Sequence, residues 1–236
     1  MTVVVGVISP SGESNWTPDI QEIIEEAYER AGVEIRTGYQ FRTARRSLNI
    51  LFQEWANRGI NLWTIEEGSI TLNYGQGTYD LPEDTVDLIE FVIRQNSGST
   101  ANQTDIIIPR IPMPTYAAIP NKLAVGRPSQ VYVNRQAPVP QINVWPTPNQ
   151  SGYLFHYWRL RRVQDATRPG YETLDMPFRF VPAIIAGLAY NLALKIPEAM
   201  DRVAMLKQLY DEAFQLATLE DRDRSAVRFV PRIVRV

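Results

Sequence analysis

The fold is decided by the stretch Ala183-Ile-Ile-Ala-Gly-Leu-Ala-Tyr-Asn-Leu-Ala-Leu194, which is apolar on nearly every face of a helix. A helix of that kind must be covered by other elements on all sides. The stretch is shorter than the ~20 residues that span a bilayer, it contains Asn191, and Lys195 follows it. It therefore predicts the buried central helix of a bundle, which begins near Pro182 and runs to about Ile196.

The remaining helices should supply the apolar faces that cover it. Pro197 begins the last helix, whereas Thr17-Pro18-Asp19 provides the capping hydroxyl, proline and early acid of the first one. A second helix is predicted from about Thr37 to Asn57. Each helical pair then has an unmatched apolar face, so the two pairs should form one four-helix bundle. One residue from each helix should be fully buried: Ile24, Leu51, Leu188 and Leu206.

Between Trp63 and Val163 proline and turn residues become dense, and the apolar runs are short and β-branched. Ser69-Ile-Thr-Leu72 and Tyr74-Gly-Gln-Gly-Thr-Tyr79 predict a strand, a turn and a strand, with Gly75-Gln-Gly77 as the turn of a hairpin. Further strands are predicted at 86–94, 105–108, 130–134, 141–145 and 153–160. The expected fold class is α+β. It comprises a helical bundle from residues 1–62 and 175–220, an inserted antiparallel β domain over 63–174, and an extended C-terminal tail over 221–236.

Charge and composition narrow the possible functions. The formal net charge is only −2, so the total charge points neither to nucleic acid nor to a membrane surface. The chain has no cysteine, which excludes disulfides, thiol nucleophiles and cysteine-based metal sites. The apolar opening Met1–Pro10 has no basic residue and is a poor signal peptide.

Candidate catalytic groups are few. His156 is the only histidine and lies in an aromatic strand, where we interpret it as a structural histidine with its hydrogen bonds satisfied. Four carboxylates cluster after Pro82: Glu83, Asp84, Asp87 and Glu90. Such a cluster can do acid–base work or hold magnesium, but a solvated turn that leads into a strand is the favoured interpretation. We therefore expect no catalytic residue, no metal, no cofactor and no enzymatic activity.

Two groups of arginines are candidate interaction residues. Arg42, Arg45 and Arg46 lie on the polar side of the second helix, where they face either DNA phosphates in a channel or acids on a neighbouring helix or subunit. The segment from Arg222 to Val236 has five arginines and one acid, and is net +4. Because Val, Ile and Phe are interleaved, it is suited to dock as an extended strand on another protein, with packing on its own body as the alternative. The expected docking residues are Arg222, Arg224, Arg228, Phe229, Val230, Arg232, Ile233 and Arg235.

A series of short motifs covers most of the chain from about Pro18 onward. They are Ala44-Arg-Arg-Ser-Leu-Asn-Ile-Leu-Phe-Gln-Glu-Trp-Ala-Asn-Arg-Gly59, Leu62-Trp-Thr64, Tyr79-Asp-Leu-Pro82, Tyr116-Ala-Ala-Ile-Pro-Asn-Lys122, Gly126-Arg-Pro128, Val144-Trp-Pro146, and Glu220-Asp-Arg-Asp-Arg224 leading to Arg228-Phe-Val-Pro231. In this order they resemble the head-to-tail adaptor proteins of short-tailed bacteriophages. That group includes the tail tubular protein A proteins and the packaged-DNA stabilisation proteins. No single motif is diagnostic.

The resemblance implies a structural protein of the virion neck, assembled in the host cytoplasm, that forms a dodecameric ring between portal and tail. The implied partners are the portal protein, nozzle and tail fibre proteins, and further copies of the chain. Packaged DNA would pass through the channel, no membrane would be involved, and the C-terminal segment would reach the portal. Two alternatives stay open: another neck or nozzle component, and a carbohydrate-binding β module. Five aromatic residues could form a sugar platform for the second, although an aromatic core or interface is the favoured interpretation: Trp63, Tyr74, Tyr79, Trp145 and Trp158.

Overall fold

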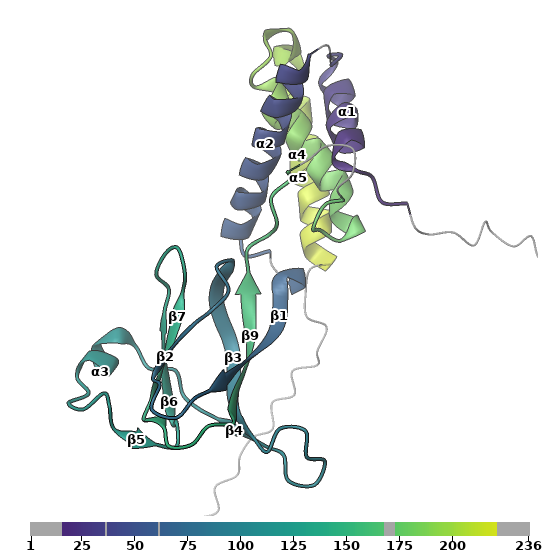
Figure 1. The fold of residues 1–236 in the computed structure, drawn as a ribbon. Coiled ribbons are helices and arrows are strands. Elements are labelled where there is room, and N and C mark those ends of the chain that lie inside the picture. Colours follow the sequence, from purple (N-terminus) through teal and green to yellow (C-terminus); the bar gives the residue numbers. More distant parts are fainter. Residues whose placement is uncertain (1–15, 36, 61, 168–172, 221–236) are drawn as a thin grey trace, which may run out of the picture. The chain divides into compact units, whose positions relative to one another are not determined.

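The predicted central helix is α4, Val181–Ala193, in the computed structural model (Figure 1). Three helices pack against it: α1 (Ile20–Ala31), α2 (Gly38–Asn57) and α5 (Val203–Glu220). The predicted burial of one residue from each helix is confirmed, because none of the four is more than 1% exposed: Ile24, Leu51, Leu188 and Leu206. The apolar stretch is therefore enclosed by helices from both ends of the sequence.

The structure describes residues 16–35, 37–60, 62–167 and 173–220. They divide into a helical unit from the described parts of 1–60 and 164–236, and a β unit from 61–163. The predicted insertion ended at residue 174, whereas the helical unit resumes at Gln164. Asn49 of α2 explains the difference, because its side-chain oxygen accepts the Ala166 backbone N–H at 2.8 Å.

Close packing around α4 depends on a glycine and on a buried polar contact. A Cβ added at Gly187 would lie 2.8 Å from the Tyr210 ring and 3.0 Å from Leu51, so α2 and α5 approach α4 closely here. The Trp55 indole N–H donates a buried hydrogen bond of 2.8 Å to the Tyr210 hydroxyl. Phe180 packs on Trp55, with ring centroids 5.7 Å apart. Together these contacts fix how α2 and α5 lie on α4.

The helix ends follow local capping signals. The predicted bounds of α2 are close to the observed ones, and Thr37 is its N-cap, whose hydroxyl accepts the Gln40 backbone N–H. The predicted start of α1 at Thr17 is wrong, because Asp19 is the N-cap and forms a reciprocal capping box with Glu22. Short 3₁₀ helices precede the last two α-helices: η2 (Phe178–Phe180) and η3 (Pro197–Arg202).

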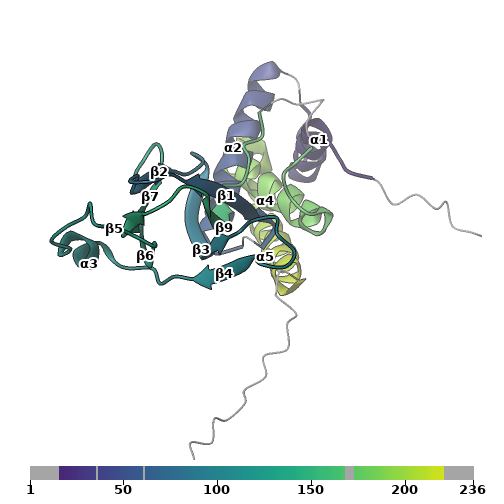
Figure 2. The same cartoon turned by 60° about the horizontal axis from the view of Figure 1, so that its bottom comes forward.

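The β unit contains two antiparallel sheets and one short parallel pair (Figure 2). The first sheet has the order β1-β9-β3-β4, formed by Ile65–Leu72, Tyr153–Arg161, Thr85–Gln95 and Thr104–Ile107. The second has the order β2-β7-β6, formed by Thr78–Asp80, Gln141–Trp145 and Gln130–Asn134. The remaining elements are η1 (Leu62–Thr64), α3 (Met113–Ala117), β5 (Val125–Gly126) and β8 (Thr147–Pro148). Fourteen buried side chains, among them Leu72, Phe91 and Phe155, form one apolar core within this unit.

Two features of the β unit differ from the prediction. The strands on either side of Gly75 do not pair as a hairpin, because β1 pairs with β9 and β2 pairs with β7. The intervening turn instead carries the chain from one sheet to the other, and the Tyr79 hydroxyl holds it by accepting the Asn73 N–H at 2.8 Å. The expected domain was antiparallel throughout, whereas β5 and β8 pair in parallel.

An ionic network joins three strands at one end of the first sheet. Arg159 of β9 donates to Asp84 at 2.5 Å, to Glu66 of β1 at 2.8 Å and to Thr85 of β3 at 2.8 Å. Arg161 donates to the second oxygen of Glu66 at 2.5 Å. The hydrogen bond from Arg159 lowers the pKa of Asp84 below its ordinary value. Charges at this end of the sheet are thus paired with one another.

Candidate interaction surface

The predicted arginines of α2 lie on a partly apolar outer face of that helix. Arg42 and Arg46 are exposed, and Tyr39 and Ile50 on the same side are 68% and 54% exposed. Their spacing of three and four residues places these four side chains, the basic stripe, along one side of the helix. Among the described residues, the guanidinium groups of Arg42 and Arg46 make neither a hydrogen bond nor an ion pair. These two guanidinium groups are therefore available to bind acidic or phosphate groups of another molecule.

Arg45 differs from its two neighbours. It is half-buried, and its guanidinium donates a hydrogen bond to the backbone carbonyl of Thr167 within the helical unit. Sequence reasoning placed all three arginines together on the polar side of α2. The structure leaves two of them open and uses the third to hold the chain segment that returns to the helices.

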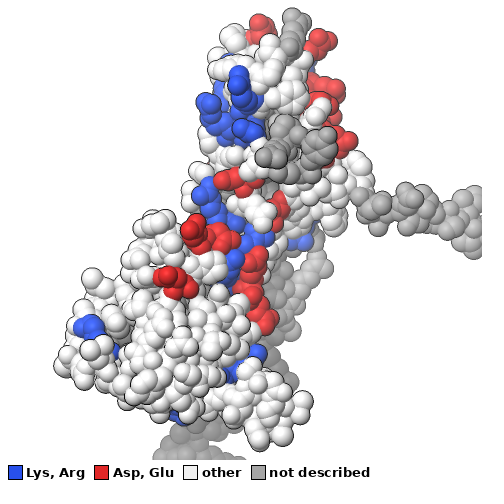
Figure 3. Space-filling view, viewed as in Figure 1, with Lys and Arg blue, Asp and Glu red and all other residues white. Residues whose placement is uncertain are grey.

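A second charged face lies on α1. Glu22, Glu25 and Glu29 are exposed, and Glu26 is half-buried in an ion pair of 2.8 Å with Arg30. These four glutamates, the acidic stripe, follow the same helical spacing as the arginines. Figure 3 shows basic side chains gathered over α2 and acidic side chains along α1 of the same unit. The stripe was visible in the sequence as Glu at 22, 25, 26 and 29, but sequence reasoning used only the apolar side of this helix.

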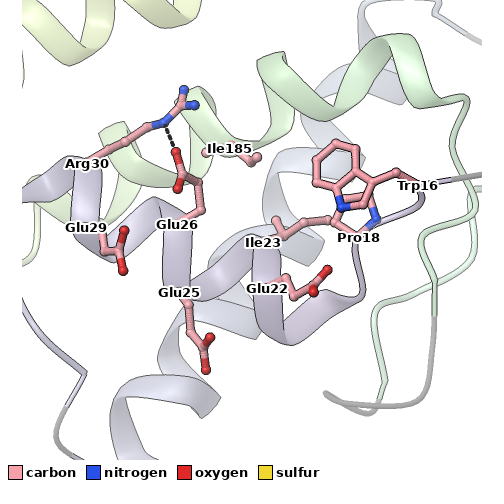
Figure 4. A pocket seen from close by; sticks show the side chains of 9 residues that line it. All are labelled: Trp16, Pro18, Glu22, Ile23, Glu25, Glu26, Glu29, Arg30 and Ile185. Carbon is pink, nitrogen blue, oxygen red and sulfur yellow. Dashed lines mark hydrogen bonds and ion pairs between the residues drawn. The ribbon is translucent and has the colours of Figure 1, made fainter. Parts of the chain in front are cut away.

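A groove runs beside the acidic stripe, between α1 and the start of α4. It consists of two adjoining hollows of about 480 and 700 Å³, which share Trp16, Pro18, Ile23, Arg30 and Ile185 (Figure 4). The smaller hollow is edged by the four glutamates, whereas the larger one is lined mainly by apolar side chains that include Phe178 and Val181. Trp16 is 73% exposed and Phe178 is 80% exposed at its rim. This α1 groove is suited to a segment that combines apolar and basic side chains.

A third exposed face lies on α5. One side of this helix packs on α4, and Leu206, Tyr210 and Ala217 are buried. A second row of apolar side chains lies in solvent, each at least 45% exposed: Met205, Leu209, Leu216 and Leu219. The exposed Glu212 lies within this row, and exposed apolar side chains that gather on one helix face mark interaction sites on soluble proteins. Sequence reasoning missed it because one apolar stripe sufficed to place the helix.

The carboxylates after Pro82 do not gather into a site. Asp84 pairs with Arg159, whereas Asp87 pairs with Arg110 at 2.9 Å and with Arg135 at 3.4 Å. Within the described ranges, no group of three or more His, Cys, Asp or Glu side chains is placed to hold a metal ion. Each aspartate has its own arginine partner, which favours the structural interpretation of this cluster.

His156 and the aromatic residues occupy separate structural positions. His156 is 5% exposed, its Nε2 lies 2.9 Å from Glu67, and its Nδ1 has no hydrogen-bond partner among the described residues. We expected both ring nitrogens of this histidine to be hydrogen-bonded, whereas among the described residues only Nε2 has a partner. The five candidate platform residues are spread over η1, the turn after β1, and strands β2, β7 and β9. Tyr79 is buried, so it cannot present a ring to a sugar.

The expected portal-docking residues lie outside the described part of the chain: Arg222, Arg224, Arg228, Phe229, Val230, Arg232, Ile233 and Arg235. Among the helices that the structure does describe, none is long and apolar enough to cross a membrane.

Comparison with known proteins adds the family. A search of the curated proteins finds no match to the chain. The family model described as SU10 adaptor protein matches residues 10–235, which include both units and nearly all of the C-terminal segment. This match indicates a phage head-tail adaptor, in agreement with the resemblance seen in the motifs. The chain belongs to the SU10 adaptor protein family.

Proposed function

We propose that the chain is a non-catalytic ring subunit that joins the phage portal to the tail nozzle and surrounds the DNA channel. The family match over residues 10–235 carries the proposal, because a single adaptor family accounts for nearly the whole chain. The motif order supports a relationship to the tail tubular protein A group, and with it a dodecameric ring. Adaptor rings of this kind have the portal, the nozzle and tail fibre proteins as neighbours, and the packaged DNA passes through them.

The helical unit would form the body of the ring as a four-helix bundle. Its support is the way α1, α2 and α5 pack on α4, which leaves three outward helix faces available for neighbours. Arg42 and Arg46 either contact a neighbouring subunit or face the DNA in the channel. The apolar row on α5 supports burial of this unit in an assembly, because such a row costs free energy when it stays in water.

The C-terminal residues 222–236 would attach the ring to the portal. Arginines provide forked donors for carboxylates on an acidic partner surface. The Val, Ile and Phe side chains can fill pockets while the backbone adds to the edge of a sheet. Ring symmetry strengthens a weak single contact, because once one tail has docked the others bind at a high effective concentration.

The absence of a catalytic role is part of the same proposal. Its support is that Asp84 and Asp87 are each neutralised by arginines and that His156 lies buried beside Glu67. The purified protein should therefore turn over neither DNA nor peptidoglycan. Turnover that is lost on substitution of Glu83, Asp87 or His156 would contradict this part.

Electron microscopy of the full chain, alone and with portal protein, tests the function directly. We expect ring-shaped particles that cap the portal, and we expect the dodecamer to be the main class. Truncation after Asp221 should leave a folded protein, since α5 ends at Glu220, and should abolish co-sedimentation with portal. Undiminished portal binding by the truncated protein would overturn the assignment of the tail. A chain that forms no ring under either condition would overturn the function itself.

A further inference from the structure

We propose that neighbouring copies of this chain bind each other by placing the basic stripe of α2 of one copy in the α1 groove of the next. The inference rests on the proposed ring function and names the contact that would build the ring. Both surfaces belong to the described helical unit, and no other described residue covers either of them. The occupant is a second copy of the same chain.

The two surfaces match in charge. Arg42 and Arg46 have no partner among the described residues, and Glu25 and Glu29 are exposed on α1. One helical turn separates the two arginines, and one helical turn separates the two glutamates, so each pair is ~6 Å apart along its helix axis. Two helices that lie side by side can therefore bring both arginines to both glutamates at once. Within one copy these groups do not reach each other.

The surfaces also match in apolar character. The basic stripe has Tyr39 at one end and Ile50 towards the other, both more than half exposed. The α1 groove has Trp16 and Phe178 exposed at its rim, and Ile185 inside it. Aromatic and arginine side chains that fill a pocket at the centre of an interface dominate its binding free energy. Tyr39 and Ile50 would fill the apolar hollow while the arginines meet the glutamates beside it.

The same features favour a second copy over duplex DNA as the partner of the arginines. Phosphates would take up Arg42 and Arg46, but they offer nothing to Tyr39 and Ile50, which flank the two arginines at either end of the stripe. DNA would also leave the acidic stripe without a partner. Because the two surfaces lie on different helices and differ from each other, the contact is heterologous, and repeated rotation closes such contacts into a ring.

Charge reversal gives the first test. One variant carries Glu25→Arg and Glu29→Arg, and the other carries Arg42→Glu and Arg46→Glu. Each variant alone has two faces of like charge and should associate with itself on the order of 100-fold more weakly than the wild type. An equal mixture of the two should restore assembly, because every contact then again joins opposite charges. A single chain that carries all four changes should also assemble by itself.

A matched control is available on the same unit. Asp201→Arg with Asp211→Arg changes the net charge by as much as the α1 variant does, at exposed positions of η3 and α5. This control should sediment like the wild type, and circular dichroism should show native helix content in all variants. Self-association should weaken as salt is raised, since exposed charge pairs are screened.

The absence of cysteine makes cross-linking a second and independent readout. Glu25→Cys and Arg46→Cys proteins, treated with a short bismaleimide, should give mixed dimers when combined and little product when separate. Equal yields of the two homodimers and the mixed dimer would overturn the proposed pairing. So would unimpaired assembly of both reversed variants, and the proposed ring function would then stand on another interface.

The DNA alternative has its own outcome. If Arg42→Glu with Arg46→Glu abolishes binding to a short duplex in a mobility-shift assay and leaves self-association unchanged, the arginines face DNA and the inference is wrong. A wild-type chain that stays monomeric at every concentration, alone and with portal, and gives no mixed dimer would count against the ring function itself.

Discussion

Replacing Gly187 by alanine tests the close packing of α4 against its neighbours. The added Cβ would lie 2.8 Å from Cε2 of Tyr210 and 3.0 Å from Cδ2 of Leu51. The Tyr210 ring has little room to move, because its hydroxyl accepts a hydrogen bond from Trp55 and the ring packs on Phe214 with centroids 5.8 Å apart. Leu51 is fully buried. The contact must therefore be relieved by a shift of α4 or α5.

Two effects of opposite sign decide the outcome. Alanine in a helix interior is favoured over glycine by ~1 kcal/mol. Forcing an extra carbon into a well-packed core costs ~1–3 kcal/mol. Because both contacts are shorter than ordinary van der Waals contact and involve held side chains, we expect the packing cost to prevail, with a net loss of ~1 kcal/mol.

The matched control is Gly38→Ala at the first residue of α2. No atom lies within 4 Å of its added Cβ, so only the loss of chain freedom in the unfolded state should count. We expect a gain of ~0.4–1 kcal/mol at this position. Urea unfolding followed by circular dichroism at the helical band measures both changes. A Gly187→Ala protein that is as stable as Gly38→Ala, or more stable than the wild type, would refute the packing described for α4.

Three further predictions concern stability. Leu188→Ala removes a fully buried side chain from α4 and should cost ~2–5 kcal/mol; an unchanged melting midpoint would contradict the central place of this helix. Tyr210→Phe leaves the buried indole N–H of Trp55 without its acceptor and should cost ~1–3 kcal/mol in urea unfolding; an unchanged midpoint would show that this hydrogen bond does not stabilise the fold. Asp84 has a pKa lowered by its hydrogen bond from Arg159, so its contribution is complete above the ordinary aspartate pKa of ~4 and is lost as the pH falls through the lowered value. Thermal melts at a series of acidic pH values should show this loss in the wild type and a smaller one in Asp84→Asn; equal slopes would argue against it.

Long, strongly patterned segments could be predicted from the sequence. The stretch from Ala183 is buried as a helix because its apolar content allows no other placement. The start of α1 was misplaced by two residues, since Thr17-Pro18 looked like a cap while Asp19 with Glu22 forms the reciprocal pair. The prediction of a hairpin at Gly75 is wrong for a different reason. Strand pairing depends on partners far along the chain, and β9 outcompetes β2 for β1 by offering eight paired residues.

The candidate interaction surface could likewise be predicted only in part. Arg42 and Arg46 were found because charges on the polar side of an amphipathic helix are visible in one element. The α1 groove was not, because Trp16 and Phe178 are far apart in the sequence and meet only when α1 packs on α4. A pattern within one helix shows which side chains face solvent. It does not show which other segment completes a hollow beside them.

The pairing of β1 with β9 has a consequence for how this chain is put together. Ile65 and Leu160 are direct neighbours in that antiparallel pair, so the chain enters and leaves the first sheet at points about 5 Å apart. An insertion whose ends meet in this way can be lengthened, shortened or exchanged while the polypeptide on either side keeps its course, which is why such sites tolerate inserted modules. The β unit is therefore connected as an exchangeable insertion. A short turn in its place would join the two parts of the helical unit directly. Substitutions, insertions or deletions within the β unit can therefore change what that unit contacts while the helices before and after it in the sequence stay the same.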